Sequence, residues 1–379
     1  MTRWVVPAIV AVTATLLFTG CGAERSAADA TSAEHRIGMV FDLGGRGDMA
    51  HNDSAYEGLV LIAQEFGGFI ANDPDSVNYG DLVEIRYVEP RVGGQDREQA
   101  LRGFGEAGFD LVFGLGFAFT DAVDRIAQEF PNTHFALIDA VVPDDASNNN
   151  LSGVLFAENE GSFLVGALAG MMTRNSDARV GFIGGMDIPL IHTFHGGFAA
   201  GAMHTNAALR SEDMVLAEYI GQDPTAFHDP ESAEQIAQQM YDQGVHIIFH
   251  ASGGSGAGIF QAAYDRGRWA IGVEFDQAFR FAVADTAIER AIGERIVTSM
   301  LKRVDRAIFL RSSDLINGGG RIEGGSIRLG LQEDGVGFVV NDFNREMLEP
   351  HLEELERLRE QIIAGEILVP DSPTFEGES

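Results

Sequence analysis

Short apolar segments alternate with helical patterns along most of this chain, and this alternation restricts its fold more than any other feature. RIGMVF at residues 36–41 precedes the helical pattern SAYEGLVLIAQEFG, and DLVFGLG at 110–116 precedes FTDAVDRIAQEF. The same alternation returns from RVGFIGG at 179–185 to RWAIGVEFD at 268–276. Apolar runs bounded by Gly, Asp and Pro, each followed by a helix, predict parallel sheets covered by helices on both faces.

The repeats form two series that meet near residues 155–160, and a chain of 379 residues is long for one compact core. We therefore expect two doubly wound α/β lobes joined by a hinge. The expected division is an N-terminal lobe of 36–157 plus about 299–318, a C-terminal lobe of 158–298 plus about 319–365, and a tail of 366–379. Ligands of such sheets bind beyond the carboxyl ends of the strands, so the cleft between the lobes is the expected binding site.

The N-terminus resembles a lipoprotein signal. Arg3 is followed by the apolar run VVPAIVAVTATLLF, which is short for a membrane span, and then by the lipobox-like LFTGC. We expect residues 1–20 to be a signal peptide, Cys21 to carry the lipid (palmitate among its acyl chains), and residues 21–35 to be a flexible tether. The protein would then be anchored to the cell membrane on its extracytoplasmic side; ordinary secretion is the alternative.

The charge balance argues against nucleic acid as a partner, because 57 acidic and 26 basic side chains give a formal charge of -31. Lys302 is the single lysine of the sequence, and every other basic side chain is arginine or histidine. A compact ammonium cannot be exchanged freely for a planar guanidinium. The lone lysine therefore suggests a specific role, with chance retention as the alternative.

The loops that follow the predicted strands carry glycines, carboxylates and aromatic rings. The loop after residue 41 has Asp42 and three glycines, and the S-x-x-E pattern of Ser54 and Glu57 predicts that its helix begins at residue 54. It lacks both G-K-[ST] and G-x-G-x-x-G, so phosphate and dinucleotide binding are not supported. Carboxylates accept hydrogen bonds from diols and aromatic faces stack on flat rings, which favours a neutral ligand with hydroxyls and a ring. The histidine spacing predicts no metal site, and no cofactor is expected.

Seven ordered motifs, among them GMVFDLGGRGDMAHNDSAYEGL, EGSFLVGALAGMMT, VGFIGGMDIPLIHTFHGGFAAG and AIGVEFDQ, resemble the basic membrane protein family. These are purine nucleoside receptor lipoproteins that serve ABC importers. The resemblance covers roughly residues 36–345. It implies a type I periplasmic-binding-protein fold, a nucleoside ligand and ABC permease subunits as partners. A binding protein for a sugar or other small polar ligand is the nearest alternative, and a nucleoside hydrolase-type enzyme is a remote one.

The resemblance also implies roles for individual side chains. Phe194 would stack on the base, Asp276 or Glu274 would bind the ribose hydroxyls, and Lys302 would lie near the cleft. The remaining positions implied to contact the base or the cleft wall are Asp42, Asn52, Asp121, Gly253 and Gly254. In the first loop the sequence departs from the family, because His51 replaces the usual phenylalanine that covers the other face of the base. Imidazole can still stack and can also donate a hydrogen bond, so we expect His51 to have a binding role and to make affinity pH-dependent.

Overall fold

The computed structural model describes residues 33–374, except 43, 49, 92, 93, 95, 143–149, 175 and 321. The expected signal peptide, the lipidation site Cys21 and most of the expected tether lie outside this range, as does the end of the tail from residue 375. Within it, no helix is both long and apolar enough to cross a membrane.

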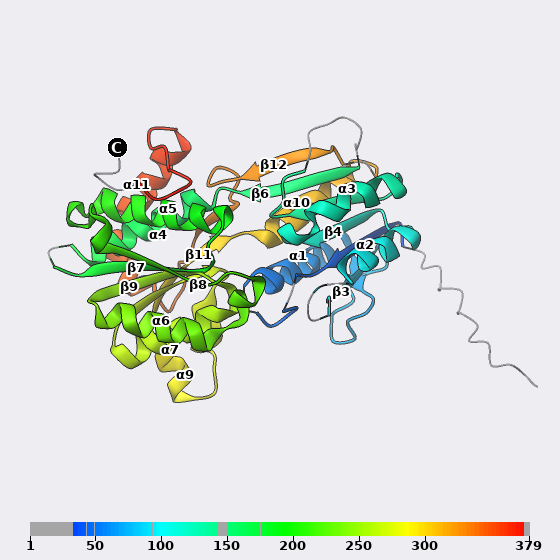
Figure 1. Cartoon of the computed structure of the whole chain (residues 1–379). Helices are drawn as coiled ribbons and strands as arrows, with labels where there is room; N and C mark the ends of the chain where they lie inside the picture. Colours follow the sequence, from blue (N-terminus) through cyan, green and yellow to red (C-terminus); the bar gives the residue numbers. More distant parts are fainter. Residues whose placement is uncertain are drawn as a thin grey trace, which may run out of the picture. The chain divides into compact units, whose positions relative to one another are not determined.

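The first sheet contains seven described strands in the order β12-β6-β5-β4-β1-β3-β2, and every adjacent pair is parallel (Figure 1). Its strands are β1 (His35–Val40), β2 (Gly68–Ile70), β3 (Val83–Val88), β4 (Leu111–Leu115), β5 (His134–Ile138), β6 (Leu151–Phe156) and β12 (Gly325–Leu329). Successive residues of a strand face opposite sides of the sheet. Thus Met39 packs in the core with Leu59, whereas Val40 packs in a separate core with Leu101.

Helices cover both faces of this sheet, as the alternation predicted. They are α1 (His51–Phe66), α2 (Arg97–Glu106), α3 (Thr120–Glu129) and α10 (Val304–Asn317), with a short 3-10 turn, η1 (Phe117–Phe119). Helix α10 packs against α1, and its Asp305 backbone N–H donates to Ser54 Oγ at 3.3 Å. Helices α2 and α3 supply the core on the opposite face.

The second sheet has six described strands in the order β13-β11-β10-β9-β7-β8, and only the β11–β13 pair is antiparallel. Its strands are β7 (Arg179–Met186), β8 (Val215–Gly221), β9 (Val245–Ala251), β10 (Trp269–Glu274), β11 (Ile296–Lys302) and β13 (Val336–Phe338). Its helices are α4 (Glu158–Met172), α5 (Pro189–Thr205), α6 (Pro230–Asp242), α7 (Gly256–Arg266), α8 (Gln277–Ala282), α9 (Ala287–Gly293) and α11 (Arg345–Ile363). The 3-10 turns are η2 (Ala207–Leu209), η3 (Glu212–Met214), η4 (Pro224–His228) and η5 (Gly253–Ser255).

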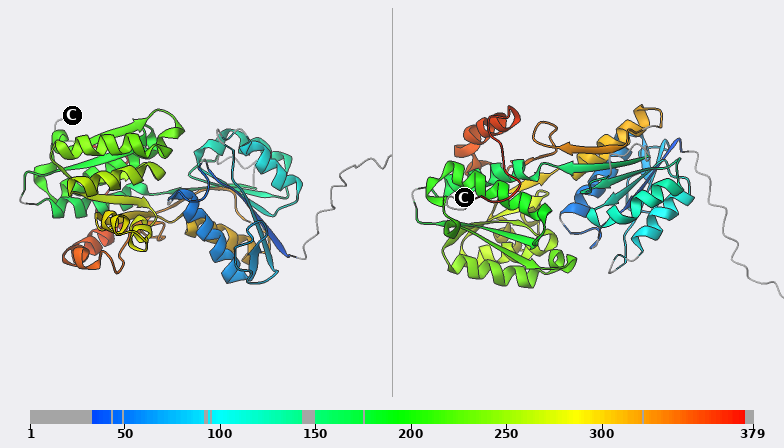
Figure 2. Two further views of the ribbon diagram at one scale, coloured as in Figure 1. Left: turned by 90° about the horizontal axis from the view of Figure 1, so that it is seen from below. Right: turned by 45° about the horizontal axis from the view of Figure 1, so that its top comes forward.

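The chain passes between the two sheets at three places, which Figure 2 shows as the segments that join two groups of helices and strands. The crossings run from β6 to α4, from β11 to α10 and from β12 to β13. Two parts of the expected lobe division therefore differ from the structure. Residues 299–302 belong to the second sheet, and residues 325–329 pair with β6 in the first. An isolated apolar segment does not specify which strand it will pair with, so the sequence pattern could not assign these two strands.

The expected start of helix α1 was also wrong. The helix begins at His51 rather than at residue 54, because the Asp48 carboxylate accepts hydrogen bonds from the backbone N–H groups of Ala50, Asn52 and Asp53 at 2.9, 3.0 and 3.2 Å. An acidic side chain that satisfies the first free N–H groups stabilises a helix start. As a result, His51 stands at the first position of the helix, at the end that faces the second sheet's loops.

Helices α4 and α5 pack unusually closely in the second lobe. A Cβ atom on Gly201 would lie 2.0 Å from the Phe163 carbonyl oxygen, and one on Gly166 would lie 2.1 Å from the Phe198 carbonyl oxygen. Only glycine permits backbones to approach in this way. The close packing fixes α5, which carries Phe194, against α4, which begins with Glu158.

Candidate ligand-binding site

A cavity lies where the carboxyl ends of the two sets of parallel strands face one another. Residues of the first lobe that line it follow β1, β4 and β5 or begin α1 and α2; those of the second lobe follow β7, β8, β9, β10 and β11. About 930 Å³ of space lies within it, part of which is open to solvent. The expected cleft between two lobes is therefore present, at the strand ends where the fold class predicts it.

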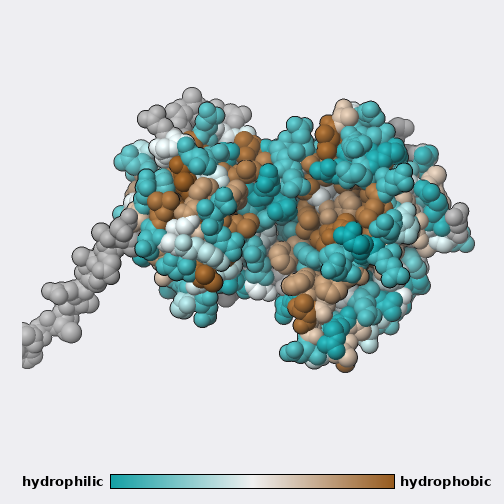
Figure 3. Space-filling view, turned by 180° about the vertical axis from the view of Figure 1, so that it is seen from behind, coloured by the Kyte–Doolittle hydropathy of each residue, from teal (hydrophilic) through white to brown (hydrophobic). Residues whose placement is uncertain are grey.

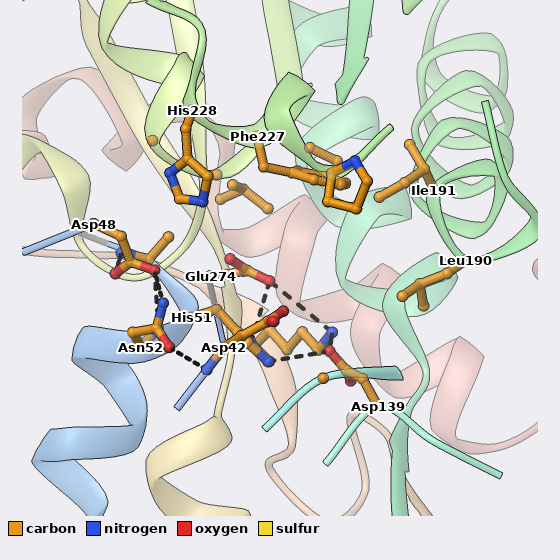
Figure 4. Close-up of a pocket in the computed structure, with 18 of the residues that line it drawn as sticks. Asp42, Asp48, His51, Asn52, Asp139, Leu190, Ile191, Phe227, His228 and Glu274 are labelled. Atoms are coloured by element: carbon orange, nitrogen blue, oxygen red, sulfur yellow. Dashed lines mark hydrogen bonds and ion pairs between the residues drawn. The ribbon is translucent and has the colours of Figure 1, made fainter. Parts of the chain in front are cut away.

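One side of the cavity is apolar. Phe194, Leu190 and Ile191 come from α5, and Phe227 comes from η4 (Figure 4). Phe194 is almost fully buried, and the Lys302 ammonium lies 5.7 Å from the centre of its ring. These side chains form a surface that a flat, uncharged ring could contact.

A buried ionic cluster surrounds Lys302, the last residue of β11. Its Nζ lies 2.6 Å from Asp139 Oδ2, 3.2 Å from Glu158 Oε1 and 4.0 Å from Glu274 Oε1. The Lys302 side chain is only 1% exposed, so its charge depends on these partners. Three carboxylates surround one ammonium, and Asp139 belongs to the first lobe whereas Glu274 belongs to the second.

Burial and charge act in opposite directions within this cluster. Burial disfavours the ammonium form, but the carboxylates of Asp139, Glu158 and Glu274 outweigh it and raise the pKa of Lys302. Burial raises the pKa of Glu158 to about 7, although Lys302 acts against the shift. Burial likewise raises the pKa of Glu274, against the opposing effects of His51 and Lys302. The cluster thus keeps its lysine charged and holds a surplus of carboxyl groups, which can accept hydrogen bonds from ligand hydroxyls.

His51 lies between two of these carboxyl groups. Its Nε2 is 3.5 Å from Asp139 Oδ2, and its Nδ1 is 3.7 Å from Glu274 Oε1. Figure 4 shows the imidazole reaching from the start of α1 toward both groups. The His51 side chain is 14% exposed. His51 of the first lobe therefore lies beside Glu274 of the second.

A second ion pair lines the first lobe. Arg97 Nη2 donates to Asp42 Oδ1 at 2.5 Å. The Asp42 backbone N–H donates to Asn52 Oδ1 at 3.0 Å, and Asn52 Nδ2 donates to Asp48 at 3.0 Å. Asn52 thereby fixes the glycine-containing loop onto α1, and it holds Asp42 in position rather than only lining the cavity.

Most of the side chains named from the sequence come together here. The cavity is lined by Asp42, His51, Asn52, Phe194, Gly253, Gly254, Glu274 and Lys302. Asp276 lies elsewhere: it accepts a hydrogen bond from the Phe279 backbone N–H in α8 and another from Asn341 Nδ2 at 2.8 Å. Asp121 lies in the first turn of α3, and its side chain is outside the described part of the chain. Of the two acidic residues considered for ribose, Glu274 is the one that lines the cavity.

The sequence interpretation missed several residues of the site. Asp139 directly follows β5, so the rule that drew attention to other strand ends would also have found it. Its backbone φ of 63° is uncommon for a residue other than glycine. Arg97, Phe227 and His228 also line the cavity, and Glu158 reaches Lys302 from α4. Glu158 comes two residues after β6, as Asp42 does after β1. Arg97, Phe227 and His228 follow no strand directly, and only the tertiary packing brings them to the site.

Comparison with known proteins identifies the family. The family model described as ABC transporter substrate-binding protein, PnrA-like, matches residues 36–373. The chain belongs to this family of substrate-binding proteins. This confirms the resemblance found in the sequence. Membership implies a small-molecule ligand and permease partners, and the family is one of binding proteins rather than enzymes, which removes the hydrolase alternative.

Curated relatives cover nearly the whole substrate-binding protein. A Listeria innocua protein named CD4+ T-cell-stimulating antigen is 32% identical over 360 residues, which span 92% of each chain. Basic membrane protein A of Borreliella burgdorferi is 29% identical over 341 residues, covering 89% of this chain and 88% of its own.

Solved structures confirm the type I periplasmic-binding-protein fold. An ABC transporter solute-binding protein from Aeropyrum pernix K1 is 27% identical, with a TM-score of 0.68 over 89% of this chain and 94% of that one. A solute-binding protein of an ABC transporter from Conexibacter woesei has a TM-score of 0.63 at 21% identity, over 89% of this chain and 99% of that one, and shows the fold alone. Among the described residues, no group of three or more His, Cys, Asp or Glu side chains is placed to hold a metal ion.

Proposed function

We propose that this substrate-binding protein binds a nucleoside, with a purine as the base, and delivers it to an ABC permease. The observation that carries this proposal is the mixed lining of the cavity. It combines the aromatic side chains of Phe194 and Phe227 with the polar side chains of Asp42, Glu274 and Lys302. A nucleoside has the same two parts, because a flat base is joined to a sugar that bears several hydroxyls.

The buried carboxyl surplus suits a neutral ligand with hydroxyls better than an anionic one. In this proposal the base lies against Phe194, with Gly253 and Gly254 allowing the backbone of η5 to approach it. Glu274 accepts hydrogen bonds from the ribose, and charge-assisted hydrogen bonds of this kind contribute roughly 1.5–3 kcal/mol each. A phosphate on the ligand would lie near at least two carboxylates and would be repelled.

The ligand would contact both lobes and would stabilise a closed arrangement, in which the two lobes lie close together around it. A ligand shifts such an equilibrium only through its different affinity for the two arrangements. Contacts with residues of both lobes provide that difference, and the closed arrangement would then dock on the permease. We further propose that a lipid on Cys21 anchors the protein to the extracytoplasmic face of the cell membrane.

Isothermal titration calorimetry with inosine, guanosine, adenosine, uridine and ribose tests the ligand. We expect the purine nucleosides to bind most tightly and ribose to bind weakly or not at all. Binding of ribose without binding of any nucleoside would reject the proposal in favour of a sugar-binding function.

The apolar half of the site has its own test. Replacing Phe194 with leucine keeps an apolar side chain of similar reach but removes the aromatic face. Stacking on a base contributes roughly 1–3 kcal/mol, so affinity for inosine should fall by about tenfold. Unchanged affinity for inosine would show that Phe194 does not recognise the base.

A further inference from the structure

We propose that His51 is a positioning residue that joins the two lobes in a proton-dependent way, so that ligand binding releases a proton. The contact involved is the one between the His51 imidazole of the first lobe and Glu274 of the second, with Asp139 on the imidazole's other side. This inference rests on the proposed function for its ligand, but the state of the lobes without ligand tests it separately.

The His51 imidazole lies between two carboxylate acceptors, but neither is within normal hydrogen-bond distance. Its separations of 3.5 Å from Asp139 and 3.7 Å from Glu274 are longer than a normal hydrogen bond of about 3 Å. Nδ1 is buried, and within the described residues it makes no hydrogen bond. Since neutral imidazole has one donor nitrogen whereas imidazolium has two, only the protonated ring can donate to both carboxylates.

The charged groups nearest His51 are mostly acidic. The ammonium of Lys302 is shared among Asp139, Glu158 and Glu274, so the cluster lacks positive charge. Beside His51 on its own loop and helix stand Asp48 and Asp53, also acidic. An imidazolium would reduce this surplus.

Three other features near His51 do not favour a positive charge on its ring. The N-terminus of a helix disfavours a cation, and His51 is the first residue of α1. Arg97 is paired with Asp42, and His228 lines the cavity from η4 and is a second titratable histidine near the site. The carboxylates that an imidazolium at His51 would contact are those of Asp139 and Glu274, and it would lose one of these contacts if a ligand bound to either carboxylate.

The competition sets the direction of the effect. Histidine side chains ordinarily change charge between pH 5 and 8. When His51 is protonated, it occupies oxygens of Glu274 that ligand hydroxyls would use, and it draws the second lobe toward the first without ligand. A ligand that hydrogen-bonds to Glu274 displaces this contact and releases the proton. Affinity then falls as pH falls, by at most about tenfold per pH unit for one linked proton.

Three variants and a matched control separate this role from a structural one. His51→Gln never carries a charge, and His51→Lys carries one throughout this pH range. His192→Gln is the control, because His192 pairs with Asp187 at 2.6 Å within the second lobe and does not line the cavity. Glu158→Gln removes a carboxyl group of the Lys302 cluster whose pKa burial raises to about 7. Circular dichroism confirms that each variant is folded.

The first measurement needs no ligand. Small-angle X-ray scattering gives the radius of gyration of the ligand-free protein from pH 8 to pH 5. We expect it to decrease toward pH 5 in the wild type, His192→Gln and Glu158→Gln, to stay constant in His51→Gln, and to be small at every pH in His51→Lys. The same pH response in His51→Gln and the wild type would overturn the inference, as would the absence of any response in the wild type.

The second measurement is calorimetry with inosine at pH 6 in buffers of different ionisation enthalpy. We expect release of about one proton per inosine in the wild type and none in His51→Gln. Equal proton release in the two would refute the role of His51. Failure of inosine to bind any variant would reject the proposed function instead, and the scattering result would still decide whether His51 joins the lobes.

Discussion

The Arg97–Asp42 ion pair and the Lys302 cluster differ in the ratio of cations to carboxyl groups and in how deeply they are buried. Arg97 and Asp42 form an ion pair within the first lobe, and their side chains are 15% and 28% exposed. Lys302 is one cation among three carboxyl groups drawn from both lobes, and it is 1% exposed. Figure 3 shows polar side chains over much of the face that it draws, whereas the Lys302 cluster is buried.

Asp42 and Asp139 both follow a strand of the first sheet, but their surroundings give them different roles. Asp42 is satisfied by Arg97 and is held through Asn52, so its orientation is fixed before any ligand arrives. Asp139 and Glu274 compete for Lys302 and His51, so their partners can change. A matched pair fixes one wall of the site, whereas the unmatched cluster can respond to ligand, to protons and to movement of the lobes.

Removing the cation should produce the largest effect. Lys302→Met leaves three buried carboxyl groups without their ammonium, and the loss of one partner from a buried ionic group costs about 3–5 kcal/mol of unfolding free energy. The loss should be smaller at pH 5 than at pH 8, because Glu158 is protonated more at low pH. Urea denaturation at the two pH values measures both quantities.

Lys302→Arg is the control for this variant, since it keeps the charge but replaces a compact ammonium with a planar fork. We expect it to retain more stability than Lys302→Met and to lose ligand affinity. Equal stability of wild type and Lys302→Met at pH 8 would show that the cluster does not depend on its cation.

Glu158 allows the pH dependence to be isolated. Its folded-state pKa of about 7 lies above the ordinary value of 4.5, so between these values the folded protein binds more protons than the unfolded chain. Stability therefore declines as pH rises through this window. Glu158→Gln should make the free energy of unfolding fall less steeply between pH 5 and pH 7, because the contribution of the Glu158 proton is lost.

The unfolding free energy of both proteins at half-unit pH steps checks this prediction. Glu160→Gln is a suitable comparison, because Glu160 lies in the same helical turn but accepts its hydrogen bond from the Leu331 backbone N–H. If Glu158→Gln and the wild type have the same slope, the Glu158 proton is not bound in the folded state.

Loss of the Arg97–Asp42 pair should reduce stability much less than loss of Lys302. Arg97→Gln removes a pair that is partly exposed, and such pairs contribute about 0.2–1 kcal/mol. Thermal unfolding should therefore show a small decrease in melting temperature without the pH dependence of Lys302→Met. A loss as large as that of Lys302→Met would contradict the contrast between the two sites.

Sequence patterns predicted what depends on local periodicity and on strand ends. The βα alternation predicted both sheets and their helical cover, and the strand-end rule placed Asp42, Gly253 and Glu274 at the cavity. Patterns could not show that β12 crosses back to the first sheet, because pairing is decided by tertiary contacts. The same limit applies to Glu158, which meets Lys302 only because α4 starts at a crossing between the lobes.

Asp276→Ala should have the smallest effect on ligand affinity. Asp276 and Glu274 are two residues apart, and the family resemblance implied that one of them binds the ribose. In the structure Glu274 lines the cavity, whereas Asp276 caps α8 and binds Asn341.

Asp276→Ala should cost about 1 kcal/mol of stability through the lost cap and leave inosine affinity nearly unchanged. Glu274→Gln should lower affinity by more than tenfold, because an amide oxygen is a weaker acceptor than a carboxylate. Calorimetry on both variants decides between them: a large loss in Asp276→Ala with none in Glu274→Gln would mean that ligand binding brings Asp276 into the cavity through a rearrangement of α8.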